Sequence, residues 1–144
     1  MDLVNRISLP LQDGFDQIVV QEAEEILYEV LIPQCEENGI MLSQYGNHAG
    51  KNSLKTIEEY NAEKEAHKLF NVETIQRIFT SLDSIVEEDG AEIGSYALKH
   101  RVEEHPAYGE HTWNGELIAA MILRGHTAAF EDSVNCTFNV RVRE

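Results

Sequence analysis

Basic residues and cysteines are both scarce in this chain of 144 residues. Lysine and arginine total 11 against 26 aspartates and glutamates, which gives a formal net charge of −15. Such an acidic excess opposes binding to phosphate backbones or anionic membranes, so we expect no direct nucleic-acid partner and no membrane partner. Two cysteines, Cys35 and Cys136, cannot build a disulfide framework, and we expect free thiols in a reducing compartment.

Long hydrophobic runs are also missing. The longest apolar stretches fall far short of the roughly 18 residues that a membrane-spanning helix needs. The N-terminal segment has neither the basic nor the apolar region of a secretory signal, so we expect a soluble protein that is not exported. Apolar residues make up 42% of the chain, enough for one core. We therefore expect residues 1–144 to form a single domain.

The sequence lacks the common catalytic signatures. It contains no Gly-x-Ser-x-Gly elbow, no glycine-rich phosphate loop, no Gly-x-Gly-x-x-Gly turn and no Cys-x-x-Cys pair. Neighbouring carboxylates such as Glu24 and Glu25 point about 100° apart on a helix and do not make an acid–base pair. Cys35 precedes Glu36 and Glu37, which raise the pKa of a thiol. These absences predict a protein that is not an enzyme and that binds no cofactor.

Four of the six histidines lie between residues 96 and 126. They are His100, His105, His111 and His126, at spacings of five, six and fifteen residues. Zinc sites on a helix use ligands three or four residues apart, so this spacing predicts no metal site. His105 and His111 flank a loop with proline and glycine that could fold round an ion, and they are the weak candidates. A small metal-dependent enzyme that uses the histidines of residues 100–126 is one alternative function.

The apolar periodicity predicts four or five helices. The expected ranges are from residue 16 to about 38, 54–70 with a cap at Ser53, 71–90, 95–104 and 114–125. Pro33 should kink or interrupt the first of these helices. The helix that begins after Asn71 has the strongest pattern, is expected to end at Gly90, and is predicted to be the central core helix.

Two segments alternate apolar and polar residues, as strands do. Residues 134–142 predict a half-buried strand with a polar face. Residues 7–11 suit a short strand, which Pro10 confines to an edge or an end. The expected fold is mainly α, with four or five helices and a small sheet made from the N- and C-terminal segments.

The negative charge is concentrated in residues 1–90, which carry 18 acids and 6 bases, whereas residues 91–144 carry 8 acids and 5 bases. Helices with regularly spaced carboxylates can imitate the phosphates of duplex DNA. A second alternative function is therefore an acidic inhibitor, or DNA mimic, of a host nucleic-acid-binding defence protein. The simpler interpretation is that the acidic excess is a solvated helix surface. The candidate phosphate mimics are Glu22, Glu25, Glu29, Glu58, Glu59, Glu63 and Glu65.

Three stretches of the last third of the chain look familiar together. "SYALKHRVE" (95–103), "NGELIAAMILRG" (114–125) and "NCTFNVRV" (135–142) resemble a C-terminal module of uncharacterised small proteins from bacteriophages and large DNA viruses. This chain has Ala97 where that pattern has glycine and Leu117 where it has phenylalanine. The resemblance implies a viral origin, with virion assembly or interference with a host system as the role. It also implies a place in the host cytoplasm or in the virion.

The same region holds the expected partner-binding residues. Tyr96 and His100 are four residues apart on one helical face, and Lys99 brings positive charge into an acidic protein. Trp113, in a loop with Tyr108, is the expected interface anchor. The leading hypothesis is a non-enzymatic viral accessory or virion-associated protein that acts through protein–protein contacts. Its partner would be a second copy, a virion component or a host protein.

Overall fold

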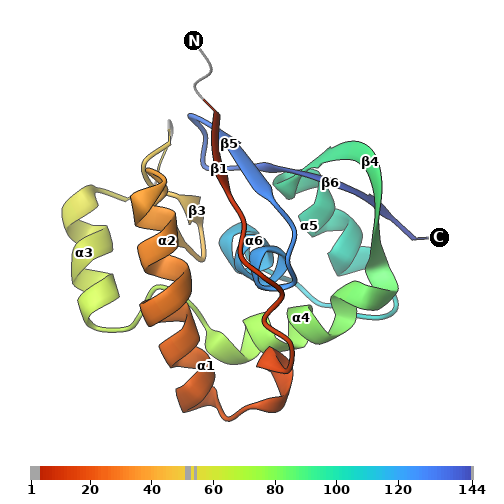
Figure 1. Cartoon of the computed structure of the whole chain (residues 1–144), viewed down its shortest axis with the longest axis horizontal. Helices are drawn as coiled ribbons and strands as arrows, with labels where there is room; N and C mark the ends of the chain where they lie inside the picture. Colours follow the sequence, from red (N-terminus) through yellow and green to blue (C-terminus); the bar gives the residue numbers. More distant parts are fainter. Residues whose placement is uncertain (1–3, 51–52, 54, 144) are drawn as a thin grey trace.

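The fold combines a four-stranded antiparallel sheet with helices packed against it, in a computed structural model that describes residues 4–50, 53 and 55–143 (Figure 1). Among the described residues, helices account for 47% and strands for 20%, with five helices and six strands. The prediction of a mainly α fold with a small sheet is therefore wrong, and the protein is mixed α/β. Two strands that were not predicted, β4 (Val86–Gly94) and β5 (Ala128–Glu131), account for most of the difference.

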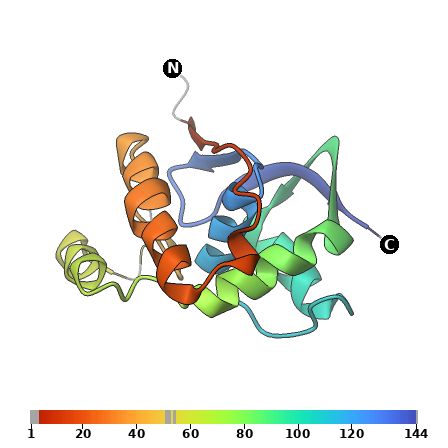
Figure 2. The same cartoon turned by 60° about the horizontal axis from the view of Figure 1, so that its bottom comes forward.

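The first helix is continuous over Val20–Glu37, although its hydrogen bonding changes on the way. It consists of α1 (Val20–Ile26), a π-helical turn η2 (Leu27–Leu31) and α2 (Ile32–Glu37). Pro33 has no N–H to donate, and it lies directly after the π turn, so the helix passes through the proline without ending. Figure 2 shows this helix with α3 on its outer side. A 3-10 turn, η1 (Phe15–Gln17), precedes α1, so the helix starts later than predicted.

Local capping explains where α3 and α4 begin. Helix α3 (Ile57–Glu65) is shorter than the predicted 54–70 because Thr56, not Ser53, is its N-cap and forms a capping box with Glu59. Helix α4 (Val72–Ile85) begins as predicted, since the Asn71 side chain accepts a hydrogen bond from the Thr74 N–H at 3.1 Å.

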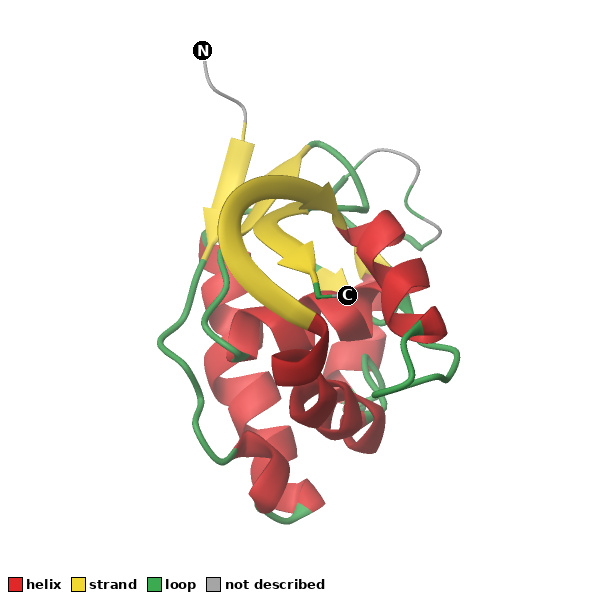
Figure 3. Cartoon of the chain, turned by 90° about the vertical axis from the view of Figure 1, so that its right-hand side faces the viewer, coloured by secondary structure: helices red, strands yellow, loops and turns green. Residues whose placement is uncertain are grey.

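The strand order in the main sheet is β1 (Val4–Ile7), β5 (Ala128–Glu131), β6 (Thr137–Val142), β4 (Val86–Gly94). Both terminal segments therefore join one sheet, but β5 lies between them. The helix predicted to reach Gly90 ends at Ile85, and β4 follows it directly. Gly90 has a φ of 80° and lies where the β4–β6 register shifts, so it serves a bulged bend in a strand, not a helix end. Figure 3 shows the strong curl of this strand.

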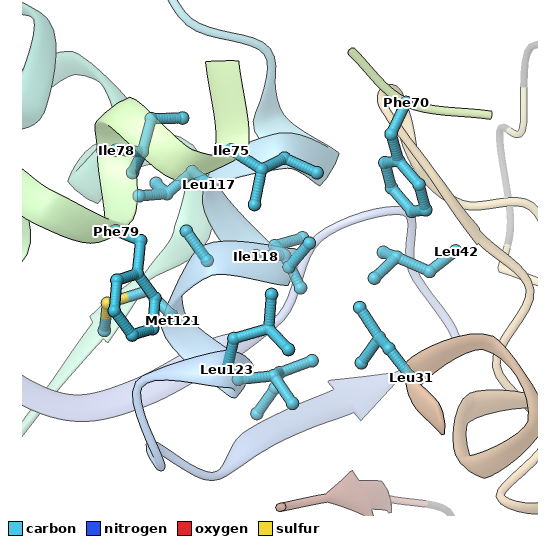
Figure 4. Packing of buried hydrophobic residues seen from close by; sticks show 14 of the residues in the cluster. Leu31, Leu42, Phe70, Ile75, Ile78, Phe79, Leu117, Ile118, Met121 and Leu123 are labelled. Atoms are coloured by element: carbon cyan, nitrogen blue, oxygen red, sulfur yellow. The ribbon is translucent and has the colours of Figure 1, made fainter. Parts of the chain in front are cut away.

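Helix α6 (Asn114–Leu123) is the centre of the core, and every residue in it is buried. It lies between the sheet and α4 (Figure 2), where Leu117, Ile118 and Met121 pack among Ile75, Ile78 and Phe79 (Figure 4). The prediction that residues 71–90 supply the central helix is wrong, because α4 is amphipathic and buries one face, whereas α6 is mostly apolar and buried on every side.

Helix α5 (Ser95–Glu104) and the short hairpin of β2 (Leu42–Ser43) and β3 (Gly46–Asn47) complete the fold. Ser95 and Asn114 are the first residues of α5 and α6, and neither side chain caps its helix. The Ser95 hydroxyl accepts from the Cys136 N–H at 3.1 Å, and the Asn114 amide donates to Asn135 Oδ1 at 2.8 Å. Both residues thus bind distant backbone and side chains. Within the described part of the chain, no helix has the length and apolarity to cross a membrane.

Candidate functional site

The connection between α5 and α6 is organised by one carboxylate, that of Glu103. It accepts from the Lys99 ammonium at 3.2 and 3.3 Å and from the Thr112 N–H at 2.8 Å. His111 Nδ1 lies 2.9 Å and His100 Nδ1 3.4 Å from the same carboxylate. Helix α5 and the loop that carries Trp113 are therefore tied together by a single side chain.

The electrostatics of this network favour the ionised form of Glu103. Burial acts to raise its pKa, but the Thr112 N–H, the Lys99 ammonium and His111 together bring the pKa below its ordinary value. Glu103 is thus a carboxylate at neutral pH. It is the counter-charge for Lys99, whose side chain is almost entirely buried.

Glu103→Gln should lower the free energy of unfolding by about 1–2 kcal/mol near neutral pH, because the Lys99 ammonium stays buried without a counter-charge. The folded pKa of Glu103 lies below its unfolded value, so the stabilisation is present above the unfolded pKa and is lost as the pH falls through the folded one. Urea unfolding at neutral and at acid pH measures both effects. The control is Glu104→Gln, because Glu104 is exposed and forms no ion pair with any described residue. Equal losses of unfolding free energy in the two variants would contradict the prediction.

A row of rings continues from this network across the surface. The Tyr96 and His100 rings meet edge to face at 4.7 Å between centroids, His111 and Trp113 at 5.2 Å, and Trp113 and Tyr45 at 5.3 Å. Trp113 is 42% exposed and Tyr96 57% exposed. We call Tyr45, Tyr96, His100, His111 and Trp113 the aromatic surface. It spans α5, the α5–α6 loop and the β2–β3 hairpin.

Cations border the aromatic surface at both ends. The Lys99 ammonium lies 5.8 Å from the centre of the Tyr96 ring, and the Lys55 ammonium lies 5.2 Å from the centre of the Tyr45 ring. Both distances are within the range of a cation–π contact. Each ammonium is also paired with a carboxylate, Lys99 with Glu103 and Lys55 with Glu63, so the two lysines add no net positive charge to the aromatic surface.

Comparisons of the chain with known protein families, with curated proteins and with solved structures found no match. The resemblance of residues 95–142 to viral proteins accordingly stays a prediction. The functional argument depends on the geometry of the site itself.

The structure brings together four of the five predicted partner-binding residues. Tyr96, His100 and Trp113 belong to the aromatic surface, and Lys99 lies beneath it as the buried partner of Glu103. Tyr108 lies elsewhere, with its ring lining a groove beside Arg77 on α4 and its hydroxyl buried. Sequence reasoning missed Tyr45 and Glu103, because the contacts of Tyr45 with Trp113 depend on a hairpin far away in the chain.

The histidines named as weak metal candidates have separate local roles. His105 Nδ1 accepts a hydrogen bond from the Ala107 N–H at 3.0 Å, whereas His111 pairs with Glu103. His126 lies beside Glu88 on the curled strand β4. In the ranges that the structure describes, no group of three or more histidine, cysteine, aspartate or glutamate residues is placed to hold a metal ion.

A serine–histidine cluster under the hairpin was not expected from the sequence. His48 Nε2 contacts the Ser43 hydroxyl, and His48 Nδ1 lies 3.0 Å from the Ser53 hydroxyl. Burial, and then the charge of Lys55, lower the pKa of His48, so the ring is neutral at physiological pH. Ser43 is only 1% exposed and His48 6%, so both side chains are buried. The cluster therefore fastens the hairpin to the segment before α3.

The proposed phosphate mimics divide into two groups. On α3, Glu59 is engaged in the capping box and Glu63 pairs with Lys55, which leaves Glu58 and Glu65 as exposed carboxylates. Along the first helix, Glu22, Glu25 and Glu29 are all exposed and form no ion pair with any described residue. The candidate phosphate mimics on α3 are thus partly neutralised, whereas those on the first helix have no neutralising partner among the described residues.

Proposed function

We propose that this chain is a non-enzymatic accessory protein of viral origin that binds a partner protein through the aromatic surface. The observation that carries the proposal is Trp113, the only tryptophan of the chain, which is exposed yet held edge-on between the rings of Tyr45 and His111. Tryptophan and tyrosine dominate the energetics of protein interfaces. A ring that is already fixed loses little conformational entropy on binding.

The surroundings of Trp113 support an interface of this kind. Glu103 fixes the loop before Trp113 through the Thr112 N–H, so the ring is presented by a rigid base. A viral setting would place the protein in the host cytoplasm or in the virion.

Trp113→Ala should weaken partner binding by about thirtyfold, since loss of an anchor of this kind costs about 2 kcal/mol. Sedimentation of the purified protein over a range of concentrations tests self-association first. A partner recovered from infected cells is then purified and titrated calorimetrically against the wild type and the variant. Ile57→Ala, which removes a similarly exposed apolar side chain on α3, is the matched control. Equal affinities of Trp113→Ala and Ile57→Ala would rule out this interface.

The acidic inhibitor remains the second candidate, because Glu22, Glu25 and Glu29 have no cation partner among the described residues. The dependence of partner binding on salt concentration distinguishes the two functions. Binding through the carboxylates should weaken steeply as ionic strength rises, whereas binding through the aromatic surface should change little.

A further inference from the structure

A groove runs along the outer face of the first helix. Its volume is about 470 Å³, and its lining comprises Ile18, Glu22, Glu25, Ile26, Glu29 and Val30. These positions recur at helical spacing, so aliphatic and acidic side chains share one stripe over three turns. The groove lies outside the aromatic surface and has no part in its contacts.

The charge of the groove is uncompensated. Residues 7–50 contain eight acids and no lysine or arginine. The cations that approach the first helix from other elements go to other carboxylates, Lys64 to Glu36 at 2.7 Å and His67 to Glu24. Glu22, Glu25 and Glu29 therefore present three negative charges that no described residue neutralises. A partner with basic side chains would complement these charges.

The groove also has an apolar component that a phosphate mimic does not need. Ile18 and Ile26 are partly exposed within it, Val30 is 38% exposed, and Val19 beside it is 63% exposed. Aliphatic side chains on a helix at spacings of three and four fit the ridges of another helix. The apolar lining favours a partner that has its own aliphatic face. It argues against a nucleic-acid-binding protein that would recognise only the phosphate-like charge of the carboxylates.

The groove is preformed. The Gln76 side chain on α4 donates to the carbonyl oxygens of Phe15 and Ile18, both at 3.0 Å, and so fixes the segment that borders the groove. Its other end lies over the π turn η2. Such turns are rare and often coincide with functional sites.

We propose that this groove binds a basic amphipathic helix of a partner protein. The aliphatic face of that helix packs on Ile26 and Val30, and its lysines or arginines pair with Glu22, Glu25 and Glu29. A second copy of this chain does not suit the groove face to face, because it would bring the same carboxylates together.

A synthetic peptide tests the proposal directly. A helix of about 18 residues, with leucines on one face and lysines on the other, is labelled and titrated with the full chain by fluorescence anisotropy. The control peptide has the same composition, with the order changed so that no apolar face forms. We expect the amphipathic peptide to bind at least about tenfold more tightly than its reordered form.

Matched variants locate the binding site. Glu22→Gln, Glu25→Gln and Glu29→Gln combined should weaken binding about tenfold, whereas Glu37→Gln, Glu65→Gln and Glu104→Gln, with the same change in net charge at exposed positions, should have little effect. Val30→Ser should weaken binding about threefold, and Ile57→Ser on α3 should not. All these positions are exposed, so the fold is retained, which thermal unfolding verifies. Trp113→Ala should bind the peptide as the wild type does.

Three results would overturn the proposal. If both triple variants lost the same amount of affinity for the peptide, the peptide would be attracted by the net charge of the protein alone. If the amphipathic and the reordered peptide bound equally well, the groove would not recognise an apolar helix face. A loss in the groove triple variant without any effect of Val30→Ser would indicate phosphate mimicry in place of helix binding. None of these results bears on the aromatic surface, so the two proposals fail independently.

Discussion

Gly115→Ala should lower the free energy of unfolding by about 4 kcal/mol, among the largest effects of any single methyl group in this fold. A Cβ at Gly115 would collide with the carbonyl oxygen of Ser43 and would lie 2.7 Å from both Gln44 C and Gly46 N. All three are backbone atoms, so no side-chain rotation relieves the clash. The hairpin would have to leave α6, and the hydrogen bond from the Gly115 N–H to Gln44 O at 2.8 Å would be lost with it.

The matched control is Gly94→Ala. A Cβ at Gly94 meets its nearest neighbour, Cys136 O, only at 4.0 Å, and its φ of −73° suits any residue. This variant should stay within about 0.5 kcal/mol of the wild type in urea unfolding. A Gly115→Ala protein as stable as Gly94→Ala would show that the hairpin does not rest on α6 as described.

Gly115→Ala should also affect the proposed interface. The β2–β3 hairpin carries Tyr45, whose ring meets Trp113 edge to face. A hairpin displaced from α6 would remove Tyr45 from the aromatic surface and free the Trp113 ring. Gly115→Ala should therefore weaken partner binding as well, even where the protein remains folded.

Local signals in the sequence predicted the parts of the fold that depend on local interactions. Asn71 caps α4 through a hydrogen bond three residues away, and Gly125 takes the left-handed conformation, with a φ of 92°, at the end of α6. Strand β4 could not be predicted in this way. It is an edge strand, in which four of the nine residues are charged and five are exposed, and it pairs with a partner more than forty residues later. A glycine with positive φ, such as Gly90, looks the same in the sequence whether it ends a helix or bends a strand.

The residues of the candidate site also differ in whether their contacts are local in the sequence. Tyr96 and His100 are neighbours on one helix, so the spacing of four residues was sufficient to pair them. Glu103 has partners on α5 and in the loop before α6, and Tyr45 lies on the distant β2–β3 hairpin. Contacts of this kind are set by tertiary packing, which no periodicity in a single sequence encodes.

Glu116 is the second residue with a large expected effect. It is completely buried in the first turn of α6, where one carboxylate oxygen accepts from the Asn71 N–H at 2.6 Å. Its other oxygen has no partner within the described residues. Burial raises the pKa of Glu116 to about 7, although the Asn71 N–H and the Arg77 charge act in the opposite direction. The carboxyl group thus joins the start of α4 to the start of α6, and it titrates near neutral pH.

This titration should make the protein less stable as the pH rises. The folded pKa of about 7 lies above the unfolded value near 4.5, so between these values the folded state holds a proton that the unfolded state has released. The contribution is fully present below the unfolded pKa and is lost as the pH rises through the folded one. The difference in pKa corresponds to about 3 kcal/mol. Urea unfolding at intervals from about pH 4.5 to about pH 8 should show this fall.

Glu116→Gln should remove the fall, because glutamine keeps an acceptor for the Asn71 N–H and cannot ionise. The variant should match the wild type at about pH 4.5 and exceed its stability by about 3 kcal/mol at about pH 8. Arg77, Tyr108 and Glu110 surround the site and are unchanged in the variant, so they contribute equally to both curves. Parallel curves for the two proteins would show that Glu116 does not titrate in this range. Glu116→Ala, which leaves the Asn71 N–H without its acceptor, should instead be destabilised at every pH. Because Trp113 is the N-cap of α6, directly before the turn that contains Glu116, protonation of Glu116 should also stabilise the position of Trp113 in the proposed interface.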